Sequence, residues 1–96
     1  MTDALDWLQK WYESQCNGDW EHQYGISIEN LDNPGWRLAI DLAETDLDGR
    51  SFESIQIERS ESDWLHCDIR EGKFVANCGP LNLSGAILAF RDWAEG

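Results

Sequence analysis

The sequence predicts an α+β protein in which a five-stranded antiparallel meander sheet has an N-terminal and a C-terminal helix packed on one face. Three observations lead to this architecture. Apolar residues recur at helical spacing near both ends of the chain, the middle alternates with a period of two, and Gly-containing turns separate the alternating runs. The 96 residues are enough for one domain, residues 1–96, and leave no room for a second.

The first helix is predicted over residues 3–16. Its apolar residues recur at the i, i+3, i+4 and i+7 spacing of one helix face, namely at Ala4, Trp7, Leu8 and Trp11. Thr2 or Asp3 can cap the N-terminus, because either side chain can accept a hydrogen bond from a free backbone amide. Asn17-Gly18 provides a stop signal at the other end.

Strand periodicity begins at Tyr24, where apolar residues start to alternate with polar or small ones. The turn sequence Asn33-Pro34-Gly35 predicts a three-residue loop between the first two strands. This loop would set two apolar pairs opposite each other on one face, Ile28 with Ile40 and Ile26 with Leu42.

Two further turns extend the predicted sheet. Asp48-Gly49 is the strongest hairpin signal of the chain and predicts a direct connection between the second and third strands. Its register would pair Leu42 with Ile55 and Ile40 with Ile57. Glu71-Gly72 predicts the last hairpin, with Ile69 opposite Phe74, Cys67 opposite Ala76 and Leu65 opposite Cys78. All three turns keep apolar residues on one side of the sheet, which favours this arrangement.

The end of the chain, residues 83–94, is predicted to form the second helix. Its apolar stripe consists of Leu83, Ile87, Phe90 and Ala94, with Trp93 beside it. Asn82 or Ser84 can cap its N-terminus. Because one face of the sheet is apolar, we expect both amphipathic helices to cover that face.

The opposite face of the predicted sheet, which we call the open face, is mostly polar. The candidate partner-binding residues on it are Glu29, Asp41, Glu58, Trp64, His66 and Asp68. Near Asp48-Gly49 the alternation reverses, so Leu47 and Phe52 are also expected on this side. The open face is interpreted either as a solvated surface or as a docking site, since aromatic anchors surrounded by charge are typical of tight interfaces.

The charge of the chain restricts its partners. Nineteen acidic and seven basic residues give a formal net charge of −12. Such a field repels phosphate, so nucleic acids and anionic membranes are not expected as partners, whereas a basic protein surface is. The sequence has no apolar run of membrane-spanning length and begins with acidic residues rather than a signal peptide, which predicts a cytoplasmic location.

The cysteines and histidines do not form a recognisable metal or catalytic motif. Zinc sites usually pair their ligands at short spacing, and Cys16, His22, His66, Cys67 and Cys78 show no such pairing. Cys16 and His22 could form a nucleophile pair, but no Gly-rich oxyanion turn accompanies them. Cys67 and Cys78 would lie about 7–8 Å apart on a strand diagonal, too far for a disulfide. We therefore predict no metal, no cofactor, no catalytic residue and reduced thiols.

A second candidate site is the polar cluster that follows Gly18, consisting of Asp19, Trp20, Glu21 and His22. Glu21 and His22 could act as an acid/base pair or contact a partner. In the alternative interpretation Trp20 is a core residue, and its two neighbours satisfy backbone groups of the loop.

Several segments together carry a family resemblance that covers nearly the whole chain. They are Leu8-Gln9-Lys10-Trp11-Tyr12, Gly18-Asp19-Trp20-Glu21-His22, Tyr24-Gly25-Ile26, Leu31-Asp32-Asn33-Pro34-Gly35-Trp36, Asp63-Trp64 with Cys67, and the closing Phe90 and Trp93. The chain resembles the immunity protein 53 family of bacterial polymorphic toxin systems. The resemblance implies a single-domain α+β cytoplasmic protein, encoded beside a toxin, that binds and neutralises that toxin. It supplies no catalytic residues.

The residues and the resemblance predict a non-enzymatic immunity protein that blocks its toxin by stoichiometric binding through an acidic, aromatic-containing surface. A nuclease toxin would have a basic active site, at which an acidic inhibitor competes with nucleic acid. Two alternatives stay open: a small Cys/His-dependent enzyme and a non-catalytic subunit of a larger complex. The sequence indicates neither the toxin nor the oligomeric state.

Overall fold

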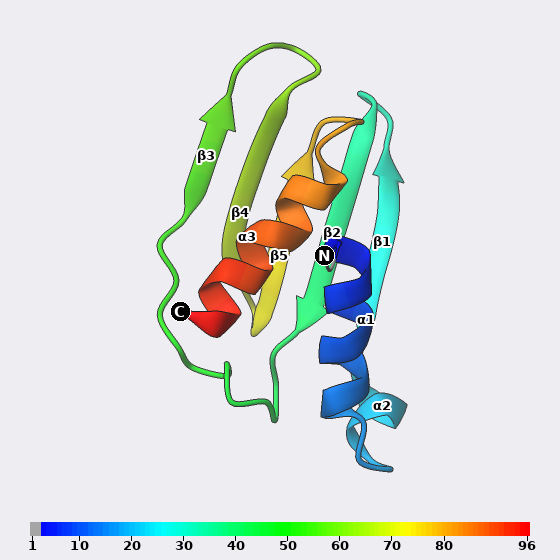
Figure 1. Ribbon diagram of the computed structural model, residues 1–96. Helices are drawn as coiled ribbons and strands as arrows, with labels where there is room; N and C mark the ends of the chain where they lie inside the picture. The colour runs from blue at the N-terminus through cyan, green and yellow to red at the C-terminus, as the bar shows by residue number, and fades with distance from the viewer. Residues whose placement is uncertain (1–2) are drawn as a thin grey trace.

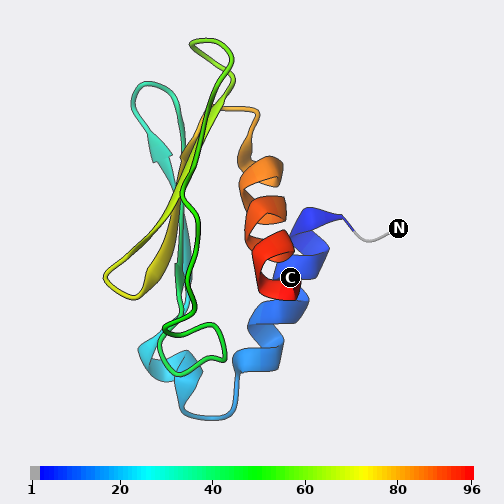
Figure 2. The same ribbon diagram turned by 90° about the vertical axis from the view of Figure 1, so that its left-hand side faces the viewer.

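The computed structural model describes residues 3–96, and its elements form two layers (Figures 1 and 2). In chain order they are α1 (Ala4–Gln15), α2 (Trp20–Gln23), β1 (Ile26–Leu31), β2 (Gly35–Asp41), β3 (Ile55–Glu58), β4 (Trp64–Arg70), β5 (Lys73–Cys78) and α3 (Leu83–Glu95). The five strands form one antiparallel sheet in the order β1-β2-β5-β4-β3. Figure 2 shows α1 and α3 on the same face of this sheet, so the predicted α+β class and helix placement are confirmed.

Both long helices have the predicted extents to within a residue or two, but they begin in different ways. Asp3 caps α1, since its carboxylate accepts a hydrogen bond of 2.7 Å from the amide of Asp6. The alternative cap, Thr2, lies outside the described residues. Asn82 precedes α3, but its side chain makes no capping bond. Its side chain is bonded to Asp63 and Trp64 instead.

The β1–β2 hairpin keeps the predicted faces but is shifted by two residues. Ile26 lies opposite Ile40, where Leu42 was predicted. Ile28 lies opposite Leu38, where Ile40 was predicted. The three-residue loop is 32–34 rather than 33–35, because Gly35 is already paired in β2. A Cβ on Gly35 would collide with the carbonyl oxygen of Cys78, so the close approach of β5 requires glycine at this strand position.

The predicted meander is wrong at one point, since β2 pairs with β5 and not with β3. Asp48-Gly49 therefore does not connect two paired strands. The predicted pairs Leu42–Ile55 and Ile40–Ile57 do not form. Residues 42–54 instead cross from the inner strand to the far edge of the sheet (Figure 1). The last four strands thus have the connectivity of a Greek key.

Local hydrogen bonds and apolar anchors explain this long connection. The hydroxyl of Thr45 donates to the carbonyl of Leu42 at 2.7 Å and accepts from the amide of Leu47 at 3.1 Å, which turns the chain out of the ladder. Leu47 is 2% exposed, and Phe52 packs edge-on against Phe74 and Trp93. Both side chains therefore lie on the helix-covered side, contrary to the open-face prediction.

The last hairpin has the predicted register at every pair, including Leu65 with Cys78 and Cys67 with Ala76. Its turn residues Glu71 and Gly72 both have positive φ, 51° and 78°. Two positive φ values are what a two-residue hairpin loop of type I′ requires, and Gly provides one of them without strain.

Aromatic side chains fill the space between the helices and the sheet around Phe90, which is fully buried. Its ring lies 5.0 Å from Trp11 and 5.1 Å from Phe74, measured between centroids. Four tryptophans pack at the edge of this core and are half-buried: Trp7, Trp11, Trp36 and Trp93. Three of their indole N–H groups find acceptors at the edge of the core, which accounts for their partial exposure. None of the helices within residues 3–96 has the length and apolar character needed to cross a membrane.

Candidate protein-binding face

The open face is the side of the sheet opposite α1 and α3 (Figure 2). The register arranges its side chains in rows that run across the strands. One row is Glu29, Arg37, Asn77, His66 and Gln56, and the next is Ser27, Ala39, Val75 and Asp68. The structure places all six candidate residues on this face: Glu29, Asp41, Glu58, Trp64, His66 and Asp68.

The centre of the open face is a shallow apolar strip between longer polar side chains. Ala39 and Val75 are each only 6% exposed, although they lie on the face opposite the helices. The rows on either side carry larger side chains, among them Arg37 and Lys73, whose stems can screen these small neighbours from water.

Two of the candidate carboxylates are engaged in holding the sheet together. Asp41 accepts a hydrogen bond of 2.9 Å from the amide of Gly25 and lies 3.5 Å from the ammonium of Lys73. Asp68 accepts from the hydroxyl of Ser54 at 2.9 Å and from its neighbour's amide, Ile69, at 2.8 Å. The Ser54 bond, followed by the backbone bond, lowers the pKa of Asp68. These carboxylates are already satisfied within the domain.

Asp41 and Glu58 lie on strands that the sequence predicted to be neighbours but that are not adjacent in the sheet. Asp41 lies on β2 and Glu58 on the edge strand β3, with β5 and β4 between them. The cause is the same error in strand order, because the prediction placed β3 directly beside β2. The open face therefore has two separate acidic regions.

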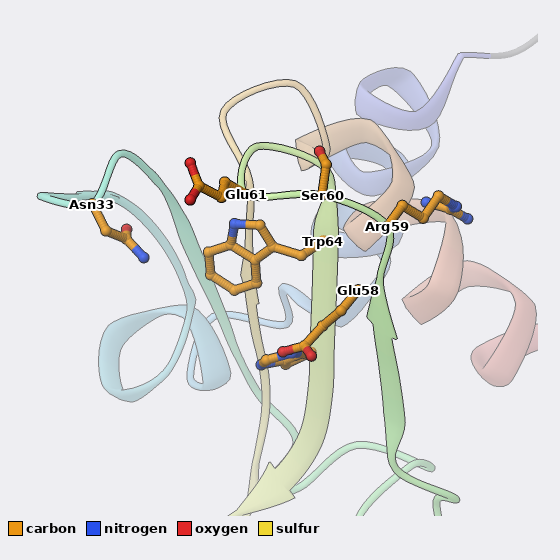
Figure 3. Close-up of a pocket in the computed structure, with 7 residues that line it drawn as sticks. Asn33, Glu58, Arg59, Ser60, Glu61 and Trp64 are labelled. Atoms are coloured by element: carbon orange, nitrogen blue, oxygen red, sulfur yellow. The ribbon is translucent and has the colours of Figure 1, made fainter.

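Glu58 belongs to the more accessible region, a hollow of about 480 Å³ at the end of the sheet where the β1–β2 and β3–β4 loops lie (Figure 3). We call it the Trp64 hollow; its lining residues are Asn33, Glu58, Arg59, Ser60, Glu61, Trp64 and His66. The Nε2 atom of His66 lies 3.0 Å from the Oε1 atom of Glu58. The imidazole also packs against the indole of Trp64, with 5.1 Å between centroids.

The loop that borders the Trp64 hollow is held by Asp63. Its carboxylate accepts bonds from the amide group of Asn82 at 2.9 Å and from the guanidinium of Arg59 at 3.0 Å. These contacts, the Asn82 bond first, lower the pKa of Asp63. Gly79 lets β5 approach the loop, because a Cβ there would overlap the carbonyl oxygen of Ser62. The hollow is therefore built on a fixed frame rather than on a free loop.

The second candidate cluster has a structural role. Trp20 is 2% exposed and its indole donates to the carbonyl of Ala43 at 2.9 Å. The carboxylate of Glu21 accepts from the amides of Asn17 and Gly18 at 2.9 and 2.8 Å. Backbone hydrogen bonds, from its own amide first, lower the pKa of Glu21. Trp20 and Glu21 thus match the interpretation of a core residue and a loop stabiliser.

The two flanking residues of that cluster lie on the surface. Asp19 accepts from the side-chain amide of Gln23 at 3.2 Å, across the single turn of α2. His22 is exposed.

The two buried cysteines offer little nucleophilic chemistry. Cys16, Cys67 and Cys78 are all free, and the last two are buried in the sheet core. Burial, with a smaller contribution from Cys78, raises the pKa of the Cys67 thiol to about 12, so it stays protonated at neutral pH. Within residues 3–96, His, Cys, Asp and Glu form no group of three that could hold a metal ion.

Comparison with known families identifies the relatives of this chain. Residues 5–95 match the sequence model of a family described as immunity protein 53. The chain belongs to the immunity protein 53 family. Searches of curated proteins and of solved structures found no match. Membership in this family supports an immunity function and a non-catalytic role in general.

Sequence reasoning found the open face but missed most of the Trp64 hollow. Asn33 and Ser60 reach it from two different hairpin loops, and Glu61 was not singled out. The available signal was the run Glu58 to Trp64, in which acidic residues and one aromatic lie within a single hairpin. The position of Asn33 beside this hairpin depends on the strand order, and the turn sequences alone do not define that order.

Proposed function

We propose that the protein is a bacterial cytoplasmic immunity protein that neutralises a cognate protein toxin by stoichiometric binding through the open face, without catalysis. The observation that carries this proposal is a sheet face that neither α1 nor α3 covers, on which a framed hollow combines an indole with two glutamates that have no lysine or arginine partner among residues 3–96. Family membership supports the immunity role. Anchoring aromatics within a charged rim are typical of tight protein interfaces.

The charge of the chain supports a basic toxin surface as the partner. A net charge of −12 attracts a basic protein over distances longer than direct contact, which raises the association rate. A nuclease is the toxin class that fits this field best, because its active site must attract a polyanion. Binding there would exclude the nucleic acid without any chemical step.

The test measures binding to the toxin encoded beside this protein, together with protection of cells that express the toxin. The variant pair Glu29→Gln with Glu58→Gln removes two charges from the open face while keeping side-chain shape. The matched control pair, Glu13→Gln with Asp48→Asn, removes two exposed charges from α1 and the β2–β3 connection.

We expect the open-face pair to slow association and to flatten its dependence on salt, while the control pair has a smaller effect on both. Equal effects of the two pairs would exclude the open face as the binding surface. Failure of the wild-type protein to bind or protect would overturn the proposed function itself.

A further inference from the structure

We infer that the Trp64 hollow receives an arginine side chain of the protein that docks on the open face; the identity of that protein as a toxin rests on the proposed function. The guanidinium would stack on the indole of Trp64 and donate hydrogen bonds to Glu58 and Glu61. This assigns one anchoring pocket, and one partner residue type, to a face that is otherwise broad and shallow.

The arrangement of the side chains supports a flat cation as occupant. Figure 3 shows the Trp64 indole face-on between the carboxylate of Glu61 above and that of Glu58 below, with the amide of Asn33 directed toward the ring. A planar guanidinium that lies on an indole can still donate in its own plane to acceptors at the ring edges. Lysine presents a point charge and cannot use both features in this way.

The charge balance within the hollow points to the same occupant. Among residues 3–96, Glu61 has no ion-pair partner, and Glu58 contacts only His66, through one oxygen, while its side chain remains 63% exposed. Arg59 does not neutralise them, because it is bonded to Asp63 at 3.0 Å and points away from the indole in Figure 3. Among residues 3–96, no lysine or arginine is therefore paired with Glu58 or Glu61, although Arg59 lines the hollow.

Two of the other open-face carboxylates have cationic partners of their own, whereas Glu29, like Glu61, has none among residues 3–96. Asp41 has Lys73 at 3.5 Å, and Asp68 has Ser54 at 2.9 Å and Arg70 at 3.9 Å. An apolar side chain in the hollow would leave two carboxylates desolvated and unpaired, which disfavours it strongly. A guanidinium satisfies both carboxylates with charge-assisted hydrogen bonds.

The frame of the hollow is in place before any partner arrives. Asp63 joins the β3–β4 loop to Asn82 at 2.9 Å, and the amide of Gly79 donates to the carbonyl of Trp64 at 3.0 Å. Little ordering is then needed on binding, so more of the contact energy appears as affinity.

The first experiment titrates the full-length protein with N-acetyl-arginine methylamide while NMR follows the indole N–H of Trp64. The matched probe is N-acetyl-citrulline methylamide, which has nearly the same shape and no charge. We expect saturable shifts at Trp64 and Glu61 with the arginine probe, smaller shifts with citrulline, and loss of the shifts in Glu58→Gln/Glu61→Gln. Equal responses to both probes, or shifts confined to other surfaces, would overturn the inference.

The second experiment measures the dissociation constant for the toxin by calorimetry. We expect Glu58→Gln/Glu61→Gln to weaken binding by about tenfold or more, as for a central interface anchor. The control Glu13→Gln/Asp48→Asn removes the same charge and should have a smaller effect. Equal affinities of the two variants would reject the hollow as an anchor and leave the proposed function intact. Absence of toxin binding by the wild-type protein, with a positive arginine titration, would reject the proposed function and support the guanidinium site.

Discussion

Phe74 and His66 lie on neighbouring strands of one sheet, yet Phe74 is fully buried beneath α3 while the side chain of His66 remains 38% exposed. Phe74 points to the helix-covered face, where its ring lies 5.1 Å from Phe90. His66 points to the open face, where it pairs with a glutamate. Strand alternation alone separates the two environments.

The difference teaches how a domain of this size divides its tasks. Apolar area on one face provides most of the favourable free energy of folding, since burial there is nearly complete. The opposite face buries less apolar area, so its residues are available for the binding that we propose for it. If this division holds, substitutions on the two faces should affect stability very unequally.

The largest expected effect is at the centre of the covered face. Phe90→Ala removes a ring that is fully buried among other aromatic side chains and should lower the free energy of unfolding by about 3–5 kcal/mol. Urea denaturation followed by tryptophan fluorescence measures this loss. Should the variant not fold, Phe90→Leu should fold with a smaller loss. A Phe90→Ala variant as stable as wild type would contradict the core assignment.

The next effect tests the frame of the Trp64 hollow. Gly79→Ala places a Cβ against the carbonyl oxygen of Ser62, so the loop must move, at a cost of about 1–3 kcal/mol in stability. Gly85→Ala is the matched control, because its Cβ would meet nothing within 4 Å and alanine favours helix by about 0.5–1 kcal/mol. We therefore expect Gly79→Ala to lower the melting temperature and Gly85→Ala to raise it. A destabilised Gly85→Ala or an unchanged Gly79→Ala would show that this packing is described incorrectly.

Prediction from sequence succeeded where a short local signal determines the geometry. Glu71-Gly72 defines a two-residue loop, and every pair of the last hairpin followed from it. The spacing of Leu8 and Trp11, and of Ile87 and Phe90, likewise determined which helix faces pack on the sheet. The side of the sheet on which Trp64 and its acidic neighbours lie follows from the alternation.

Prediction failed where two local signals favoured different chain paths and contacts between residues distant in sequence determined which path formed. Asp48-Gly49 has the composition of a hairpin turn, but Thr45 turns the chain earlier, and burial of Leu47 and Phe52 holds the connection against the core. The alternation cannot decide between β3 and β5 as the neighbour of β2, because both present an apolar face. Because the prediction placed β3 beside β2, it did not show that Asn33 lines the Trp64 hollow.

A smaller effect concerns acid and the loop before β1. The folded-state pKa of Glu21 is lowered by backbone amides, so the unfolded chain takes up this proton first as the pH falls. The contribution of Glu21 is therefore complete above the ordinary glutamate pKa of 4.5 and is lost as the pH drops through the lower folded value. Glu21→Gln should lower the urea midpoint more at pH 7 than at pH 3. The same difference at both pH values would exclude the carboxylate as the source.

The smallest expected effect is at Trp64, and it returns to the comparison of the two faces. Trp64→Thr removes a half-buried indole but keeps a residue that favours strands, so the loss of stability should not exceed about 1 kcal/mol. The frame of the hollow should survive, because Trp64 contributes to it through its backbone: its amide donates to Asn82 at 3.3 Å and its carbonyl accepts from Gly79 at 3.0 Å. Urea denaturation of this variant beside Phe90→Ala measures the contrast directly. A loss at Trp64 as large as that at Phe90 would mean that the open face also carries the stability of the domain, and the division of tasks between the faces would be wrong.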